Sequence, residues 1–412
     1  MRQKYKNIIK KFIPISLLRQ LKAVVEGVQI RRLSRYDRKP FDKNFYKYGI
    51  NLIGSFSHNS GLGESCRIVA REVEATGLPH GFIDFSIYES VANPDRTFEG
   101  KLGTSFDYGI NLLHINMHEM VSAFKQIGLE RLDRHYNIAF WSWEVQRFPQ
   151  EWVPLINILD EIWAPSDFIR DAIKKVTSKP VFTVRDHLEV ETNDELGRSD
   201  FGLPEDTFLF LMMFDNSSIA DRKNPKAVIK AFKKAFKKDE NVALVIKISN
   251  MDERMRKSIL EKLDGYKVYF VDGMLDKRDV NRLIQLCDTY VSLHRAEGFG
   301  LVLAEAMLLG TPTIATNWSA NTEFQNEEVA CMVDYKLVYV GKNIWPYKVD
   351  DIWADADVDM ASEYMRKLYE DVDFREGLIE KAREHAMRVL SMEQATTVIK
   401  QRVEEIWYNN KL

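Results

Sequence analysis

The acids Glu297 and Glu305 lie on either side of the short segment Gly298-Phe299-Gly300. Seven residues separate them, so on one helix they would point about 80° apart and would not be i,i+4 neighbours. The apolar run before them, TYVSLH, predicts a strand, and the run after them, LVLAEAMLLG, predicts a helix that ends at Gly310. We therefore expect Glu297 in a strand-to-helix turn and Glu305 near the second turn of the helix.

The residue types in this turn suit a ligand that carries phosphate and sugar groups. Gly298 and Gly300 let the backbone come close to a ligand, and free amides at a helix start favour an anion such as phosphate. Carboxylates only accept hydrogen bonds, so Glu297 and Glu305 suit the paired hydroxyls of two sugars. A phosphate flanked by two sugars is a nucleotide sugar. From spacing alone, an ordinary glycine turn with two solvated glutamates is the alternative interpretation.

The elements that must position this turn alternate between strands and helices. In the first half of the chain, YGINLIGSF predicts a buried strand, followed by the loop SHNSGLGES and a helix, SCRIVAREVEATG, that ends at Gly77. Three more apolar runs, YGINLLHI, YNIAFWSWE and DEIWAPS, predict short strands, and Ser166 is expected to cap the helix DFIRDAIKKV. Strands that alternate with helices imply a parallel sheet with crossovers.

The same alternation restarts after the polar stretch ETNDELGRSDFGLPEDT, with the strands DTFLFLMMF, NVALVIKIS, YKVYFVDG and CDTYVSLH and the helix NPKAVIKAFKKAF. At 412 residues the chain also exceeds the roughly 250 to 300 residues at which a single core stops growing. We therefore predict an α/β fold with two Rossmann-like domains, at residues 46–192 and 200–390. A basic leader (1–45) precedes them, and a terminal helix (391–412) follows.

Composition and charge exclude several classes of protein. Residues 1–40 contain twelve Lys or Arg and two acids, a local charge of +10. Because the net charge of the whole chain is −3, the other 372 residues carry −13. The lysine-rich run AVIKAFKKAFKK is better interpreted as a solvated helix than as a nucleic-acid site. No apolar run approaches the roughly 18 residues of a membrane span. Because the three cysteines are widely spaced, they favour a reducing cytosol, and we expect a cytoplasmic protein.

The segment EGFGLVLAEAMLLGTPTIAT resembles the Glu-x7-Glu motif of retaining glycosyltransferases of family 4, and a looser likeness extends over residues 48–400. The resemblance implies the GT-B fold, in which two Rossmann-like domains face each other across a cleft and a C-terminal helix crosses back to the first domain. It also implies that Glu297 contacts the donor sugar near the reacting centre and that Glu305 binds the nucleotide ribose. The amides of Gly298, Phe299 and Gly300 would meet the diphosphate or the sugar.

A second group of candidate residues lies in MMFDNSSIADRKNP, where Arg222 and Lys223 stand between a strand and the next helix. Family members place an arginine and a lysine in this loop to bind the donor diphosphate, whose charge grows as it leaves. Lys223 matches the lysine. Phe214 and Asp215, however, occupy the usual position of the arginine, so Arg222 would substitute for it. The alternative is an exposed pair at a helix start, where cations are mildly unfavourable.

The loop SGLGES contains Gly61 and Gly63 after the first predicted strand. A dinucleotide fingerprint would need a third glycine or alanine where Cys66 stands, so a dehydrogenase is disfavoured. The loop resembles the glycine loop of GT-B enzymes, which approaches the donor phosphate or the acceptor. This makes Gly61 and Gly63 donor-binding candidates, with Arg67 a weaker one. A tight turn without a ligand is the alternative.

The segment HINMHEM follows a predicted strand end, where many family members carry a histidine near the reacting sugar. Asn116 aligns with that histidine and His118 stands two residues later, so either could face the cleft; for His118, a surface role is the alternative. We expect no metal site at His114 and His118, because a third ligand is missing and the family needs no bound metal.

The stretch FWSWEVQRFPQEW is rich in tryptophan. Aromatic rings can stack on sugars, but such clusters are more often part of a core. Glu144, at the end of the preceding strand, would point into the crevice at the carboxyl ends of the strands. There it could orient or deprotonate an acceptor hydroxyl.

Together with the resemblance, these residues predict a retaining, metal-independent glycosyltransferase. It would move a sugar from a nucleotide sugar to a sugar or lipid-linked acceptor in bacterial cell-surface polysaccharide or glycolipid assembly. The nucleotide sugar is a substrate, and no cofactor is expected. The basic residues 1–40 would dock on an anionic membrane surface at the inner face of the cell membrane, with a solubilising tail as the alternative. Three other functions stay open: a sugar-nucleotide epimerase, a phosphorylase and a non-catalytic partner subunit.

Overall fold

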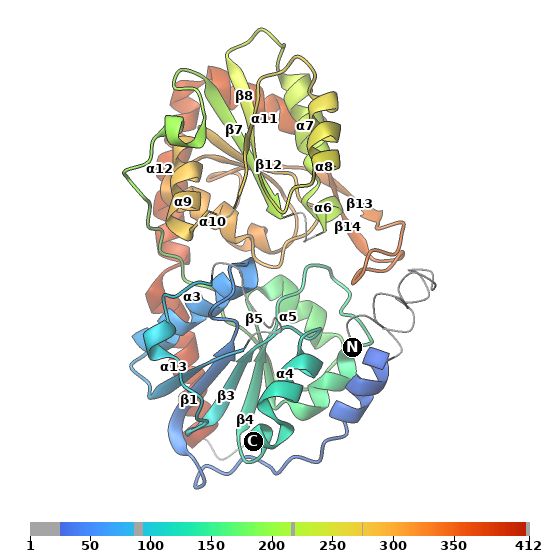
Figure 1. Ribbon diagram of the computed structural model, residues 1–412, viewed down its shortest axis with the longest axis vertical. Coiled ribbons are helices and arrows are strands. Elements are labelled where there is room, and N and C mark those ends of the chain that lie inside the picture. Colours follow the sequence, from blue (N-terminus) through green and yellow to red (C-terminus); the bar gives the residue numbers. More distant parts are fainter. Residues whose placement is uncertain (1–24, 86–93, 216–218, 274, 409–412) are drawn as a thin grey trace, which may run out of the picture.

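The computed structural model describes residues 25–85, 94–215, 219–273 and 275–408 and shows two α/β domains stacked along the long axis of the molecule (Figure 1). Each domain is built on a sheet of six parallel strands. In the first domain the strand order is β2-β1-β3-β4-β5-β6, and in the second it is β12-β11-β10-β7-β8-β9. These are the two parallel sheets with crossovers that the alternating pattern predicts.

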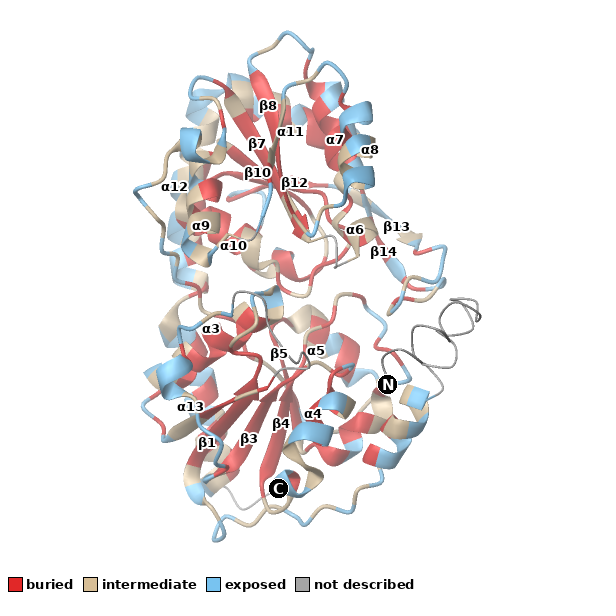
Figure 2. Cartoon of the chain, viewed as in Figure 1, coloured by how far each residue is buried: buried red, intermediate tan, exposed pale blue. Residues whose placement is uncertain are grey.

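The strands of the first domain are near-continuous apolar runs and are largely buried (Figure 2), as expected where helices cover both faces of a parallel sheet. In one pair of neighbouring strands, Ile50 lies opposite Ile110, and Leu52 lies opposite Leu112. The elements of this domain are β1 (Lys47–Gly54), α3 (Gly61–Ala75), β2 (His80–Asp84), η1 (Glu99–Lys101), β3 (Tyr108–His114), α4 (Met120–Ile127), η2 (Leu129–Leu132), β4 (Tyr136–Phe140), η3 (Val153–Ile158), β5 (Glu161–Ala164), α5 (Asp167–Lys174) and β6 (Val181–Thr183).

The second domain has the same construction, with a long pair of neighbouring strands in which Phe210 lies opposite Leu244 and Met212 opposite Ile246. Its elements are η4 (Arg198–Phe201), β7 (Phe208–Asp215), α6 (Ala220–Lys223), α7 (Pro225–Ala235), β8 (Val242–Ser249), α8 (Glu253–Lys262), β9 (Val268–Val271), α9 (Lys277–Leu286), β10 (Thr289–Ser292), α10 (Leu301–Leu309), β11 (Thr313–Thr316), η5 (Ala320–Glu323), β12 (Cys331–Val333), α11 (Val358–Glu370) and α12 (Val372–Val389).

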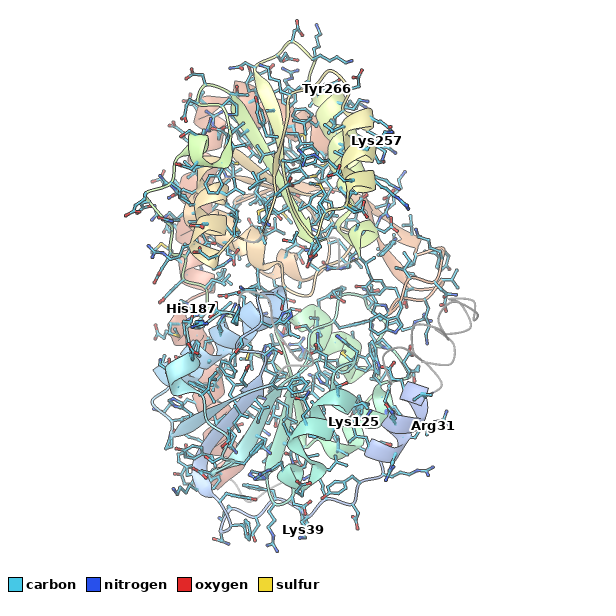
Figure 3. All side chains as sticks on the ribbon, in the orientation of Figure 1. Arg31, Lys39, Lys125, His187, Lys257 and Tyr266 are labelled. Carbon is cyan, nitrogen blue, oxygen red and sulfur yellow. The ribbon has the colours of Figure 1, made fainter. Side chains whose placement is uncertain are left out.

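The last helix, α13 (Met392–Tyr408), crosses back from the second domain and packs on the first beside α3 (Figure 1). Its buried residues Ile399, Val403 and Ile406 join the apolar cluster around β1 and β3. The chain passes between the domains after β6 and again before α13. These two segments are joined by a 2.6 Å hydrogen bond between the ring Nδ1 of His187 and the carbonyl oxygen of Leu390 (Figure 3). The terminal helix therefore crosses back to the first domain, as the resemblance implies.

An antiparallel hairpin that the sequence did not predict extends from the second domain. Its strands are β13 (Tyr335–Tyr339) and β14 (Ile352–Ala356), and we refer to residues 335–356 as the arm. One face of the arm packs into the core of the first domain through Val340, Tyr347 and Trp353. Arg147 of the first domain also donates to the carboxylate of Asp350 in the arm, at 2.6 and 2.8 Å. The arm thus joins the two domains.

The described part of the basic leader is folded against the first domain. Residues 25–33 are helical, and Ile30 and Leu33 are buried in the same core as the arm. Arg38 pairs with Asp160 of the first domain. Residues 1–24, which hold most of the leader's cations, lie outside the described residues. Within the residues that the structure describes, no helix is both long and apolar enough to cross a membrane.

Helix α3 begins earlier than the sequence pattern predicts. We expected SHNSGLGES to be a loop throughout, but Ser60 is the N-cap, its side-chain oxygen accepting from the amide of Gly63 at 3.2 Å, and the helix starts at Gly61. The glycines misled the prediction because they usually mark loops. Gly63 has a packing reason instead, since a Cβ there would lie 1.9 Å from the carbonyl oxygen of His58.

The docking of the arm leads to a prediction about stability. Trp353, 2% exposed, is buried in the core of the first domain, whereas Tyr339 on the same hairpin is 68% exposed. Truncating a buried tryptophan removes a large apolar contact, so Trp353→Ala should lower the free energy of unfolding by about 3 to 5 kcal/mol. The matched control, Tyr339→Ala, should change it by less than about 0.5 kcal/mol. Urea denaturation measures both, and equal effects would show that the arm is not docked in solution.

Candidate active site

The turn between β10 and α10 places Glu297 and Glu305 as the sequence predicts. Glu297 lies in the turn, and Glu305 lies within α10, which ends at Gly310 in a left-handed conformation. Gly300, the N-cap of α10, has a φ of +100°, a backbone conformation that side chains rarely adopt. A Cβ at Gly298 would lie 2.6 Å from the carbonyl oxygen of Trp143. The turn therefore packs directly on the first domain.

Other contacts hold the turn at the domain boundary. The hydroxyl of Ser166, which caps α5 as predicted, donates to the carbonyl oxygen of Gly298 at 2.9 Å. Arg185, which follows β6, and the amide of Phe168 both bind Glu323 of the second domain, each at 2.9 Å. The turn is thus held where the two domains meet.

Glu297 is buried and accepts hydrogen bonds from two cations. Its Oε2 accepts from Nη1 of Arg222 at 3.0 Å, and its Oε1 is paired with Lys223. Burial acts to raise the pKa of Glu297, but the charges of Lys223 and Arg222 outweigh it and hold that pKa well below the ordinary value. Glu297 is therefore a carboxylate over the whole physiological pH range.

The two cations come from the short helix α6, which Asn224 ends in a left-handed conformation. Arg222 also donates to the carbonyl oxygen of Ala296 at 2.8 Å, so its guanidinium ties α6 to the turn. Burial acts to lower the pKa of Arg222, and the charge of Glu297 raises it above the ordinary value, whereas burial lowers the pKa of Lys223. Arg222 and Lys223 thus contact the same carboxylate, although Arg222 does not directly follow the strand β7.

Ser319 contacts the backbone of the turn. The amide of Glu297 donates to the Ser319 hydroxyl at 2.9 Å. Ser319 has a φ of +77°, which is rare for a residue with a side chain. Such strained residues cluster at functional sites, where the surrounding structure holds them in place. The position of Glu297 is therefore fixed by side-chain and backbone contacts together.

Glu144 reaches the same group of charges from the first domain. Its Oε2 accepts from the hydroxyl of Tyr347, a buried residue of the arm, at 3.0 Å. Burial and the charge of Glu144 raise the pKa of Tyr347, so the phenol stays a donor. The charges of Glu144 and Glu297 both act on Arg222. The structure therefore assembles two acids and two cations, from both domains, around one point.

Glu305 lies in a second polar position on α10. It is 1% exposed, and its Oε1 is 2.5 Å from the ammonium of Lys277, the first residue of α9. Its other oxygen, Oε2, has no hydrogen-bond partner among the described residues. A buried carboxylate oxygen without a donor is rare in native proteins. This oxygen is thus available to accept a hydrogen bond from a ligand.

The remaining predicted residues have structural contacts of their own. Gly61 has open space around its Cβ position, and Arg67 donates to the carbonyl oxygen of Phe56 at 2.8 Å, which holds the segment before α3. Asn116 accepts from the amide of Ser142 at 3.0 Å, so it connects the ends of β3 and β4. None of these contacts reaches Glu297.

His118 lies beneath the arm. Its ring centre is 6.1 Å from that of Trp152 and 5.8 Å from that of Trp345 in the arm. Burial lowers the pKa of His118 to about 4, so the ring is neutral at physiological pH. The tryptophans of FWSWEVQRFPQEW, namely Trp141, Trp143 and Trp152, are buried, which agrees with the interpretation of that stretch as core.

Sequence reasoning missed two residues of this site. Lys277 gave no signal, because its contact with Glu305 depends on the packing of α9 against α10. Tyr347 lies on the arm, whose strands are short and partly exposed, and nothing in its local sequence indicates a contact with Glu144. Both contacts join residues that are distant in sequence.

One family model matches part of the chain. Residues 195–336 match the family model of glycosyl transferases group 1, a segment that lies almost wholly in the second domain and contains both glutamates and the Arg-Lys pair. A search of curated proteins gave no match.

Solved structures with this architecture include HepE of Anabaena in complex with UDP-glucose, with a TM-score of 0.61 and 13% identity over 87% of this chain and 99% of that one. Sucrose-phosphate synthase of Thermosynechococcus elongatus has a TM-score of 0.64 and 14% identity over 88% of this chain and 100% of that one. The pneumococcal O-GlcNAc transferase GtfA in complex with UDP and GlcNAc has a TM-score of 0.51 and 14% identity over 73% of this chain.

The chain spans only 57% of the length of GtfA and 56% of that of S. aureus TarM. At these identities the likenesses show the fold, which is GT-B: two Rossmann-like domains with a helix that crosses back.

The close packing of the turn generates a prediction. In Gly298→Ala the new methyl group would meet backbone at 2.6 Å, so the substitution should lower the free energy of unfolding by about 1 to 3 kcal/mol. The control is Gly377→Ala in α12, where a Cβ has open space and alanine should raise stability by about 0.5 to 1 kcal/mol. Melting temperatures measure both, and a Gly298→Ala protein as stable as the wild type would contradict the described contact between turn and first domain.

Proposed function

We propose that the protein is a retaining glycosyltransferase that moves a sugar from a nucleoside diphosphate sugar to an acceptor hydroxyl. The observation that carries the proposal is the buried carboxylate of Glu297 between Arg222 and Lys223 at the domain boundary. Glu305, with its free oxygen, lies on the helix that begins at the same turn. The match to glycosyl transferases group 1 covers this group of residues and supports the proposal.

In this proposal the donor spans the turn. The ribose binds the Oε2 of Glu305, the amides of Gly298, Phe299 and Gly300 meet the diphosphate at the start of α10, and Glu297 contacts the sugar. Arg222 and Lys223 neutralise the charge that grows on the diphosphate as the bond to the sugar breaks. The contacts of Arg222 and Lys223 with Glu297 would hold both cations in position before the donor binds.

The acceptor hydroxyl would enter from the side of the first domain, near Glu144. Tyr347 of the arm fixes the orientation of that carboxylate. Sugar and lipid-linked acceptors of cell-surface polysaccharide or glycolipid assembly fit a carboxylate that accepts from hydroxyl groups. The departing phosphate is itself basic enough to take the acceptor proton, so the proposed reaction needs neither a metal ion nor a separate base.

We also propose that the leader contacts an anionic membrane surface from the cytoplasmic side. Val25 and Val28 on its helical part are 54% and 59% exposed, and Arg31 is exposed beside them (Figure 3). Exposed apolar side chains next to cations suit the boundary between headgroups and acyl chains. Residues 1–24 add seven cations and no acid to this segment.

The nucleotide site is tested by thermal shift with UDP, GDP, ADP, TDP, CMP, NAD and inorganic phosphate. A ligand at a hundred times its Kd adds about 2.7 kcal/mol to the free energy of unfolding, so one nucleoside diphosphate should raise the melting temperature clearly. Glu305→Gln should reduce that shift while the melting temperature of the free protein stays nearly unchanged. A shift with NAD alone, or with no member of the panel, would contradict the proposal and favour a non-catalytic partner subunit.

The membrane contact is tested by deleting residues 1–24, which spares the buried Ile30 and Leu33. The truncated protein should cosediment less with vesicles that contain phosphatidylglycerol, because each lost cation near an anionic surface removes about 1 kcal/mol of attraction. Pure phosphatidylcholine vesicles are the control, and neither protein should bind them strongly. Equal binding of both proteins to the anionic vesicles would show that the leader is not the contact.

A further inference from the structure

The second domain contains a cavity of about 360 Å³ beside α6. Residues of α6, α7 and α8 line it (Figure 1), together with Arg295 after β10, Asp355 of the arm and the start of α11. Arg222 and Lys223, which contact Glu297, are not among the described residues that line it. Small-molecule sites measure about 300 to 1,000 Å³. The cavity is therefore large enough for a small ligand and is separate from the site described above.

Asn224 lines the cavity with an amide group that its own helix does not use. It is the N-cap of α7, where an asparagine side chain ordinarily accepts from a backbone amide, but here no side-chain cap bond forms. The residue is 5% exposed, and its Nδ2 has no hydrogen-bond partner among the described residues. A buried donor without an acceptor is costly. This amide thus lacks an acceptor that a ligand in the cavity would supply.

Arg295 contributes a second unused donor. Its guanidinium lies 5.1 Å from the ring centre of Trp353 and donates to Asp355 at 2.6 Å, so the side chain is held in place. Its Nε is buried and has no hydrogen-bond partner within the part of the chain that the structure describes. Two buried donors without acceptors, on Asn224 and Arg295, therefore belong to residues that line one cavity.

The charges around the cavity favour an anion. The charged residues that line it are the cations Lys226, Lys230, Lys262 and Arg295 and the acids Asp221 and Asp355. Both acids are paired, Asp355 with Arg295 and Asp221 with Lys342 of the arm. Lys226 and Lys230 are exposed on α7 and form no ion pair with another described residue. The excess of positive charge attracts a negatively charged ligand.

Much of the remaining wall is apolar. Ile229 and Ile259 are 4% and 5% exposed, and Phe214 and Met255 also line the cavity. A small inorganic anion would leave these side chains in contact with water, whereas a hydrocarbon group would cover them. The lining as a whole thus suits a ligand with an anionic group at one end and an apolar body.

We propose that this cavity is a binding site for a carboxylate with a short hydrocarbon body. The two carboxylate oxygens accept from the amide of Asn224 and from the Nε of Arg295, so two acceptors meet two free donors. The hydrocarbon body packs against Ile229 and Ile259. This inference does not rest on the proposed function, because neither Asn224 nor Arg295 contacts the nucleotide sugar in that proposal.

The cavity adjoins the segment that carries the two cations of the candidate active site. Asn224 ends α6 directly after Lys223, and the amide of Arg295 donates to the carbonyl oxygen of Arg222 at 2.7 Å. A carboxylate in the cavity therefore lies next to α6 on the side of Asp221 and Asn224.

The test is calorimetric titration of the full chain with octanoate at neutral pH, where this acid is ionised. Octanoate should bind at one site per chain with a Kd of about 0.1 to 1 mM. Octanamide has the same apolar body without the charge, and acetate has the charge without the body. Each should bind at least about tenfold more weakly than octanoate, because each lacks one of the two interactions.

Variants at Asn224 place the ligand in this cavity. Asn224→Gly removes the amide, and glycine adopts the same left-handed conformation, so octanoate should bind about tenfold more weakly to a folded protein. Asn224→Asp also tolerates this conformation and sets a negative charge against the carboxylate, which should abolish octanoate binding. The matched control is Lys257→Gln on α8 (Figure 3), which does not line the cavity and should bind octanoate as wild type.

Octanamide separates loss of the site from loss of the fold. An amide can donate to the new carboxylate, so Asn224→Asp should bind octanamide at least as tightly as the wild type does. Weaker octanoate binding in both Asn224 variants, with octanamide binding retained, is the result that supports the inference.

Three results would overturn it: no binding of octanoate to the wild type, equal affinities for octanoate and octanamide, or octanoate binding that neither Asn224 variant changes. The last result would place the ligand elsewhere on the protein. None of these results bears on the proposed function, which the nucleotide panel tests separately.

Discussion

The buried carboxylate of Glu297 accepts hydrogen bonds from Arg222 and Lys223, and this contact determines how the domain boundary is built. A buried charge is tolerated only when it is paired and hydrogen-bonded. This requirement fixes where α6 and the β10–α10 turn lie relative to each other, and Arg222 binds the backbone of the turn as well as the acid. The turn also packs closely on Trp143 and Ser166 of the first domain. This close packing leaves no room for a side chain at position 298, which explains why the residue there is glycine.

The group of charges around Glu297 takes its residues from both domains and from the arm. The second domain supplies Glu297 and its two cations, the first supplies Glu144, and the arm supplies Tyr347, which binds Glu144. Because the apolar side of the arm is embedded in the first domain, the phenol of Tyr347 is held in place by packing rather than by its single hydrogen bond. The group of charges is therefore preorganised, which in the proposed reaction would stabilise the departing diphosphate.

Sequence patterns predicted the parts that local rules govern. The two Rossmann-like sheets follow from alternating apolar runs, the cap at Ser166 and the end of α10 at Gly310 follow from residue type, and the placement of both glutamates follows from these elements. The parts that were missed depend on contacts distant in sequence: the arm, and the pairing of Lys277 with Glu305. At Gly61 and Gly63 a local rule failed, because Ser60 starts a helix where two glycines indicate a loop.

The proposed role of Glu297 is tested by the rate at which the Glu297→Gln variant releases nucleoside diphosphate from a nucleotide sugar, compared with the affinity of that variant for the nucleoside diphosphate alone. The amide keeps the shape of the side chain but loses the charge beside the proposed position of the reacting sugar. We expect a release rate lower by about 100-fold or more, with nucleotide affinity retained or increased, because Arg222 and Lys223 are then free for the diphosphate. A variant that releases nucleotide at the wild-type rate would show that the charge of Glu297 does not act on the reaction.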